Sequence, residues 1–141
     1  MQLNISFILI FFIGLISCNT EQKQSQQQET SQVQNSLNDG NKWRVNPEMK
    51  PYLQNSKDLL NEYLSNNQSD YQKLAEDLKT QNNLLIKSCT MQGQGHEELH
   101  HWLHPHIALI DQLAEAESVK DAQVIIAQLQ TSFKTYNAYF E

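Results

Sequence analysis

Residues 96–113, HEELHHWLHPHIALIDQL, have the periodicity of an amphipathic helix. Their apolar side chains recur every three or four residues, at Leu99, Leu103, Ile107, Ile110 and Leu113. That spacing places them on one face of a helix. We therefore predict a helix from His96 to about Glu117, with a kink at Pro105, because the proline ring cannot bond to the carbonyl of His101.

Three other stretches repeat this spacing, and strand-like alternation is absent from the sequence. The first is expected to begin at Pro47, with Asn46 as its N-cap, and the second to follow a cap at Ser69. The fourth is expected to follow Ser118, which forms a capping box with Asp121. Further predicted core positions are Met49, Tyr52, Leu53, Ser56, Leu59, Leu60, Tyr63, Leu64, Tyr71, Leu74, Ala75, Leu78, Leu85, Ala122, Ile125, Leu129, Phe133, Tyr136 and Phe140.

Four amphipathic helices joined by short loops predict an all-α fold, an antiparallel up-down four-helix bundle. The bundle is expected to occupy residues 43–141, which is enough chain for one small domain. The glycine-containing segment 92–95 is expected to form the turn between the second and third helices.

The first 17 residues have the features of a secretory signal peptide. Their apolar run, residues 7–16, is too short to span a membrane and is followed by polar sequence. It ends in Leu15-Ile16-Ser17-Cys18, which resembles the lipobox of bacterial lipoproteins. The resemblance implies cleavage before Cys18, acylation of this cysteine, and attachment to membrane lipid of the bacterial cell envelope, facing the periplasm or the surface. A plain signal peptide and a retained anchor are the alternatives.

Residues 18–42 comprise this cysteine and a segment rich in Gln, Ser, Glu, Asn and Thr. Such a segment cannot bury enough apolar surface to offset the entropy lost on ordering, so it predicts a flexible tether. The chain carries a formal net charge of −6. This acidic balance argues against nucleic acid as a partner and against electrostatic binding to anionic lipid. Membrane lipid, bound through acylated Cys18, and an envelope protein are the expected partners.

One group of residues in the predicted bundle suggests chemistry rather than packing. All five histidines lie within residues 96–106, shortly after Cys89, the only cysteine of the chain besides Cys18. Helix geometry places three of them in a slowly turning row, and the glycine turn brings the end of the second helix beside it. Thiolate and thioether donors favour Cu(I), whereas a cysteine with imidazoles also suits Zn(II). The predicted copper or zinc ligands are Cys89, Met91, His96, His100 and His104.

Each of these residues also has a structural interpretation. Cys89 alone is typical of a small buried hydrophobe, or of a thiol that pairs with another molecule, and Met91 is typical of a gap-filling residue. Glu97 and Glu98 are candidates for metal ligands or for acceptors of imidazole N–H groups.

The remaining aromatic and imidazole side chains of this stretch are expected outside the site. We predict that His106 is a hydrogen-bonded packing histidine, that Trp102 packs at the edge of the core, and that His101 is solvated.

The favoured function is therefore a membrane-anchored lipoprotein that binds copper or zinc for buffering, delivery or sensing, similar in general terms to small four-helix-bundle metal-binding proteins. A bundle that binds haem non-covalently and a structural or interaction lipoprotein without metal are the alternatives. The pattern His96-Glu97-x-x-His100 resembles that of zinc peptidases. We nevertheless expect no enzyme, because the domain is too small to add a substrate cleft.

Overall fold

The computed structural model describes residues 34–141. They contain a short 3₁₀ turn, η1 (Pro47–Met49), and four helices, α1 (Lys50–Ser65), α2 (Tyr71–Ser88), α3 (Gln94–Ala114) and α4 (Val119–Tyr139). The predicted all-α helical bundle is confirmed for this part of the chain. The predicted signal peptide, Cys18 and the tether up to residue 33 lie outside the described residues.

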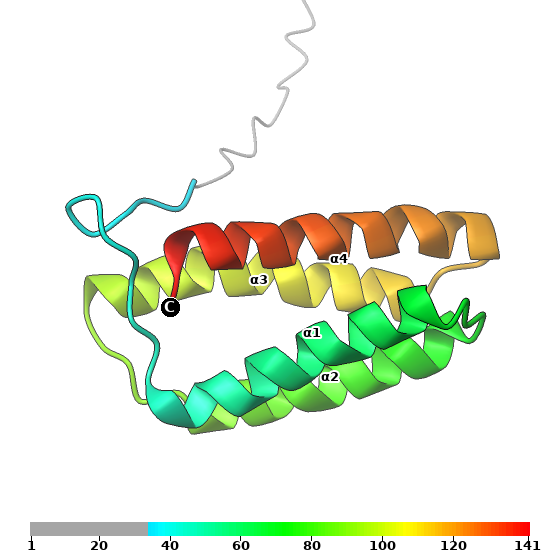
Figure 1. Cartoon of the computed structure of the whole chain (residues 1–141), viewed down its shortest axis with the longest axis horizontal. Helices are drawn as coiled ribbons and strands as arrows, with labels where there is room; N and C mark the ends of the chain where they lie inside the picture. Colours follow the sequence, from blue (N-terminus) through cyan, green and yellow to red (C-terminus); the bar gives the residue numbers. More distant parts are fainter. Residues whose placement is uncertain (1–33) are drawn as a thin grey trace, which may run out of the picture. The chain divides into compact units, whose positions relative to one another are not determined.

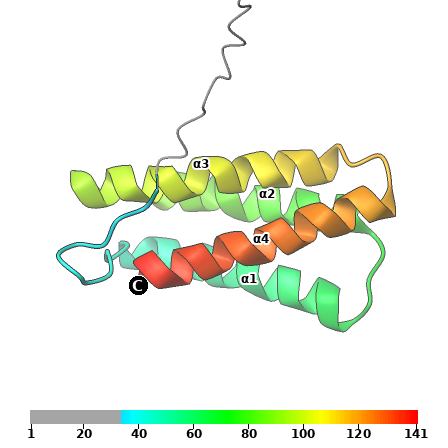
Figure 2. The same ribbon diagram turned by 90° about the horizontal axis from the view of Figure 1, so that it is seen from above.

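The helices pack in the order in which they follow one another in the chain. α1 packs on α2, α2 on α3 and α3 on α4, and α4 also contacts α1. Two layers result, one of α1 with α2 and one of α3 with α4, as Figures 1 and 2 show from two directions. None of the helices within residues 34–141 is long and apolar enough to cross a membrane.

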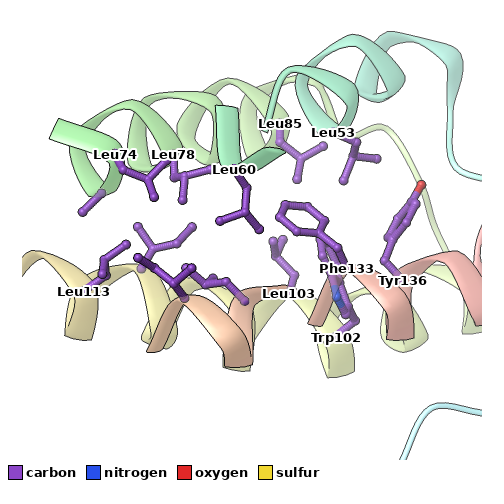
Figure 3. Close-up of a cluster of buried hydrophobic side chains, with 14 of the residues drawn as sticks. Leu53, Leu60, Leu74, Leu78, Leu85, Trp102, Leu103, Leu113, Phe133 and Tyr136 are labelled. Atoms are coloured by element: carbon purple, nitrogen blue, oxygen red, sulfur yellow. The ribbon is translucent and has the colours of Figure 1, made fainter. Parts of the chain in front are cut away.

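The core lies between the two layers and is built from the apolar stripes of all four helices. Figure 3 shows leucines of α1 and α2, among them Leu60 and Leu78, facing Leu103 of α3 and Phe133 of α4. Most predicted core positions are buried. Leu64 is exposed instead, and four more predicted positions are only partly buried: Tyr52, Leu59, Ile107 and Ile125, whose neighbour Ile126 is buried in its place.

Of the predicted helix caps, that at Ser69 is wrong and that at Asn46 holds only in position, because Asn46 is the N-cap residue of η1 but makes no side-chain capping bond. The side chain of Asn46 does not cap a helix, because its oxygen accepts a hydrogen bond from Thr90 N (3.1 Å) and its amide donates to Ser88 O (3.0 Å). α2 is capped by Asp70, whose Oδ1 accepts from Lys73 N at 2.9 Å, rather than by Ser69. The cap of α4 is confirmed by the bond from Asp121 N to Ser118 Oγ.

The segment before η1 joins the C-terminal end of the chain. Trp43 N donates to Tyr139 O (2.8 Å), Glu141 N donates to Trp43 O (2.9 Å), and Val45 N donates to Glu141 O (3.0 Å). Backbone bonds between the two ends of the domain therefore close one end of the bundle.

Candidate functional site

The start of α3 is set by a glycine. Gly93 has φ 68° and ψ −158°, a combination that is open essentially to glycine alone. Its carbonyl accepts bonds from His96 N (3.0 Å) and Glu97 N (3.2 Å), so the helix begins immediately after the connection from α2. α3 then continues through Pro105 to Ala114, three residues short of the predicted end.

His96, His100 and His104 form a row on the surface of α3, which we call the histidine row. The ring centroids of His96 and His100 are 4.4 Å apart, and those of His100 and His104 are 5.0 Å apart. His104 Nε2 lies 3.1 Å from His100 Nδ1. His100 and His104 are exposed, and His96 is half-buried. The structure therefore brings three of the five predicted ligands into contact.

The middle imidazole of the row is biased towards its neutral form. Burial lowers the pKa of His100, and the charges of nearby His96, His104 and His101 lower it further. The neutral imidazole is the form that binds a metal, because protonation occupies the lone pair of the nitrogen. Close packing of the three rings therefore lowers proton competition at the central residue.

The two sulfur-containing candidates occupy a different environment. Cys89 is the C-cap of α2 with ψ 121°, and it is a half-buried free thiol packed against the hydrophobic core. Met91 also packs on the core, with its Cε 3.6 Å from the position that a Cβ of Gly95 would occupy. Within residues 34–141, no three His, Cys, Asp or Glu side chains are arranged so that together they could hold a metal ion. Cys89 is therefore not gathered with two histidines.

Glu98 contacts a segment that the sequence placed in the tether. Glu97 is exposed, whereas Glu98 is buried and accepts bonds from Ser36 N (2.9 Å) and Asn35 Nδ2 (3.2 Å). Burial raises the pKa of Glu98, but hydrogen bonds from Ser36 and Asn35, with His101 nearby, outweigh it and hold the pKa below its ordinary value. The carboxylate is thus ionised and held by residues more than 60 positions earlier.

The structure contradicts the predicted environment of His101 and confirms that of His106. His101, predicted to be solvated, is only 34% exposed at its side chain, because it lies in a groove that Gln34 and Asn35 also line. Its Nδ1 is 3.6 Å from Glu98 Oε2. The packing role of His106 is confirmed: it is fully buried, and its Nδ1 is 2.9 Å from Ser132 Oγ.

The surroundings of His106 are aromatic. The ring stacks on Trp102 with centroids 4.8 Å apart and meets Phe133 edge-on at 4.7 Å. Trp102 is itself buried, as a packing residue, and donates from Nε1 to Ser132 O. Burial lowers the pKa of His106 to about 4. This histidine therefore belongs to the core and stays neutral at neutral pH.

The chain matches no protein-family model, no curated protein and no solved structure in three comparisons. The functional argument therefore rests on the residues and their geometry.

Proposed function

We propose that this protein is a lipid-anchored envelope protein that binds a copper or zinc ion through the histidine row of α3, for buffering, delivery or sensing. The observation that supports the proposal is the close approach of the three imidazoles, above all the 3.1 Å between His104 Nε2 and His100 Nδ1. Two histidines spaced by four residues on one helical face are a recurrent zinc-binding pair.

The chemistry of the row suits a weakly held, exchangeable ion. His100 and His104 would supply two nitrogen ligands after small ring rotations, and half-buried His96 would approach from the preceding turn. Imidazole suits both copper and zinc, and Cu²⁺ binds such a site more tightly than Zn²⁺. A tetrahedral ion held by the pair of His100 and His104 keeps open positions for water or a partner's ligand. Open positions favour uptake and transfer over a structural role.

Cys89 and Met91 stay a separate prediction. Both side chains pack against the core, so their sulfur atoms would reach an ion only if the connection between α2 and α3 rearranged. A site that included them would favour Cu(I), because thiolate and thioether are soft donors. The two ligand sets therefore differ in the metal they prefer as well as in their residues.

The proposal also includes the lipid anchor at Cys18 and an antiparallel up-down order of the helices. The lipobox-like residues 15–18 support acylation of Cys18 and a place in the cell envelope. Short connections between helices that contact each other support an antiparallel up-down order.

Metal titration of the mature chain without its lipid tests the proposal. The double variant His100→Ala/His104→Ala is expected to bind Zn²⁺ and Cu²⁺ at least about tenfold more weakly than wild type. Gln112→Ala/Glu115→Ala is the matched control, because it changes two exposed residues near the other end of α3. Equal affinity of the double variant and wild type would refute the histidine row as the site.

A second pair of variants separates the two ligand sets. Cys89→Ser and Met91→Leu are expected to leave Zn²⁺ affinity unchanged, since neither side chain contributes to the row. If these variants lose copper while the double histidine variant keeps it, the ligands are the sulfur atoms and the proposed row is wrong.

A further inference from the structure

The segment 35–43, which we call the strap, lies over the first turns of α3. At one end Asn35 Nδ2 donates to the backbone carbonyl of Glu98 (2.6 Å), while Ser36 donates to the Glu98 carboxylate from both N and Oγ. Its middle reverses direction through mutual backbone bonds between Asn38 and Asn41, with Gly40 at φ 85°. The strap is thus an ordered loop attached to a buried carboxylate.

The other end of the strap is held by Trp43. The indole Nε1 donates to Ser36 O at 2.7 Å, so the two ends of the strap are bonded to each other. The ring rests on Gly95 of α3: a Cβ at Gly95 would lie only 3.0 Å from Trp43 Cε3. Its backbone pairs with Tyr139 and Glu141. Trp43 therefore connects the strap, the start of α3 and the C-terminal end of the chain.

The strap contacts fall on the turns that carry the histidine row. Gly95 precedes His96, and Glu98 lies between His96 and His100. The N-cap of α3, Gly93, provides no side-chain hydrogen bond to the first turn. An uncapped first turn opens more readily than the rest of a helix, because several of its N–H groups have no partner within the helix. The strap does not supply partners for these N–H groups, but it fixes the same turns in another way: its donors bind the carbonyl and carboxylate of Glu98, and Trp43 packs on Gly95.

We propose that the strap regulates the metal site: its closure holds the first turns of α3 in the form that aligns the three imidazoles, and metal binding in turn favours the closed strap. This inference rests on the proposed function. Thermodynamic linkage requires the two effects to be reciprocal, so strap opening weakens metal binding by the factor by which metal suppresses opening.

The strap is first tested without metal, by limited trypsin digestion of the mature chain. Lys42 and Arg44 are exposed residues at its end, and their bonds are expected to be cut faster when the strap opens. Glu98→Gln is expected to raise the cleavage rate several-fold, and Asn35→Ala/Ser36→Ala to do the same without altering any helix residue. Glu115→Gln is the matched control, because Glu115 is an exposed carboxylate at the other end of α3.

The coupling is then tested by zinc titration of the same variants. The strap variants are expected to bind Zn²⁺ about five- to tenfold more weakly than wild type. Saturating Zn²⁺ is expected to slow cleavage of the wild-type strap by a similar factor, and Glu115→Gln is expected to keep the wild-type zinc affinity.

The outcomes separate the two proposals. If wild type binds zinc and the strap variants open but bind it equally well, the regulation is wrong and the histidine-row function stands. If both strap variants are cleaved at the wild-type rate, the bonds to Glu98 do not hold the strap closed, and the proposed regulation is wrong whatever the zinc affinities are. If wild type binds neither zinc nor copper, the proposed function is wrong, and so is the proposed coupling, which depends on metal binding.

Discussion

Protonation of His106 is expected to set the acid limit of this fold. The imidazole is fully buried between Trp102 and Phe133, with one ring nitrogen bonded to Ser132 and the other, Nε2, without a hydrogen-bond partner among residues 34–141. A proton placed there would charge a ring surrounded by apolar groups, whereas the same ring in the unfolded chain is solvated. Acid therefore favours the unfolded state through this residue.

The size and sign of the effect follow from the two pKa values. The pKa of His106 falls from 6.5 to about 4 on folding, and each unit corresponds to about 1.4 kcal/mol. Above pH 6.5 the ring is neutral in both states and costs nothing. Between pH 6.5 and pH 4 the unfolded chain binds the extra proton, so the free energy of unfolding decreases by about 3 kcal/mol in total. Below pH 4 this loss levels off.

Urea unfolding of wild type and His106→Gln, at several pH values from 7.5 to 3.5 and with a chelator present, checks this prediction. Glutamine keeps a polar group near Ser132 but does not titrate. The variant is expected to be less stable at pH 7 and to lose about 3 kcal/mol less than wild type on acidification. Stability curves that stay parallel across this range would refute the reasoning, and so would an NMR titration that gives His106 an ordinary pKa in the folded protein.

Three further changes test the fold. Leu129→Ala removes a fully buried side chain of α4 and is expected to cost about 2–5 kcal/mol of unfolding free energy, measured in urea. Asp70→Ala is expected to cost about 1 kcal/mol by removing the α2 cap, while Ser69→Ala changes stability by less than about 0.5 kcal/mol; equal losses would contradict the assigned cap. Gly93→Ala is expected to cost about 1–3 kcal/mol through backbone strain alone, since no atom lies within 4 Å of its new Cβ.

The helices and most of the core could be predicted because the evidence for them is local. Leu99, Leu103 and Leu113 are buried as their spacing predicts, and the contacts within the histidine row follow from residues four apart on one helix. The side chain of Asn46 could not be assigned in this way. A capping residue is the usual interpretation of Asn before Pro47, but Asn46 bonds instead to a connection more than 40 residues away.

Cys89 shows where helix geometry ceases to apply. Its predicted position assumed 100° of rotation per residue up to the end of the second helix. The helix ends at Ser88, and Cys89 has the extended value ψ 121°, so the rotation no longer describes where its thiol lies. The sequence correctly placed Cys89 next to the core, but it could not show whether the thiol reaches the histidines, because that depends on the conformation of the connection.

The strap could not be predicted from the sequence, because its composition is typical of a flexible linker. Residues rich in Asn, Ser and Asp cannot form a core of their own, and that argument holds for the isolated segment. Here Asn35 and Ser36 satisfy a carboxylate that α3 has partly removed from water. These hydrogen bonds stabilise the strap and the ionised carboxylate of Glu98 together. The sequence of either one alone therefore does not indicate that they form. A buried acid without a cation on its own helix face is the signal that could have prompted a search for such a segment.

The five histidines show how one helix separates chemically identical groups. Burial in an aromatic site makes His106 part of the core, and the strap covers His101 beside Glu98. In the row, His100 and His104 are exposed and His96 is half-buried, and partial burial and the charges of neighbouring histidines lower the pKa of His100. A lower pKa lets His100 keep a free lone pair at a more acid pH than an isolated histidine would. At His100 a metal therefore competes less with protons than it would at an isolated histidine.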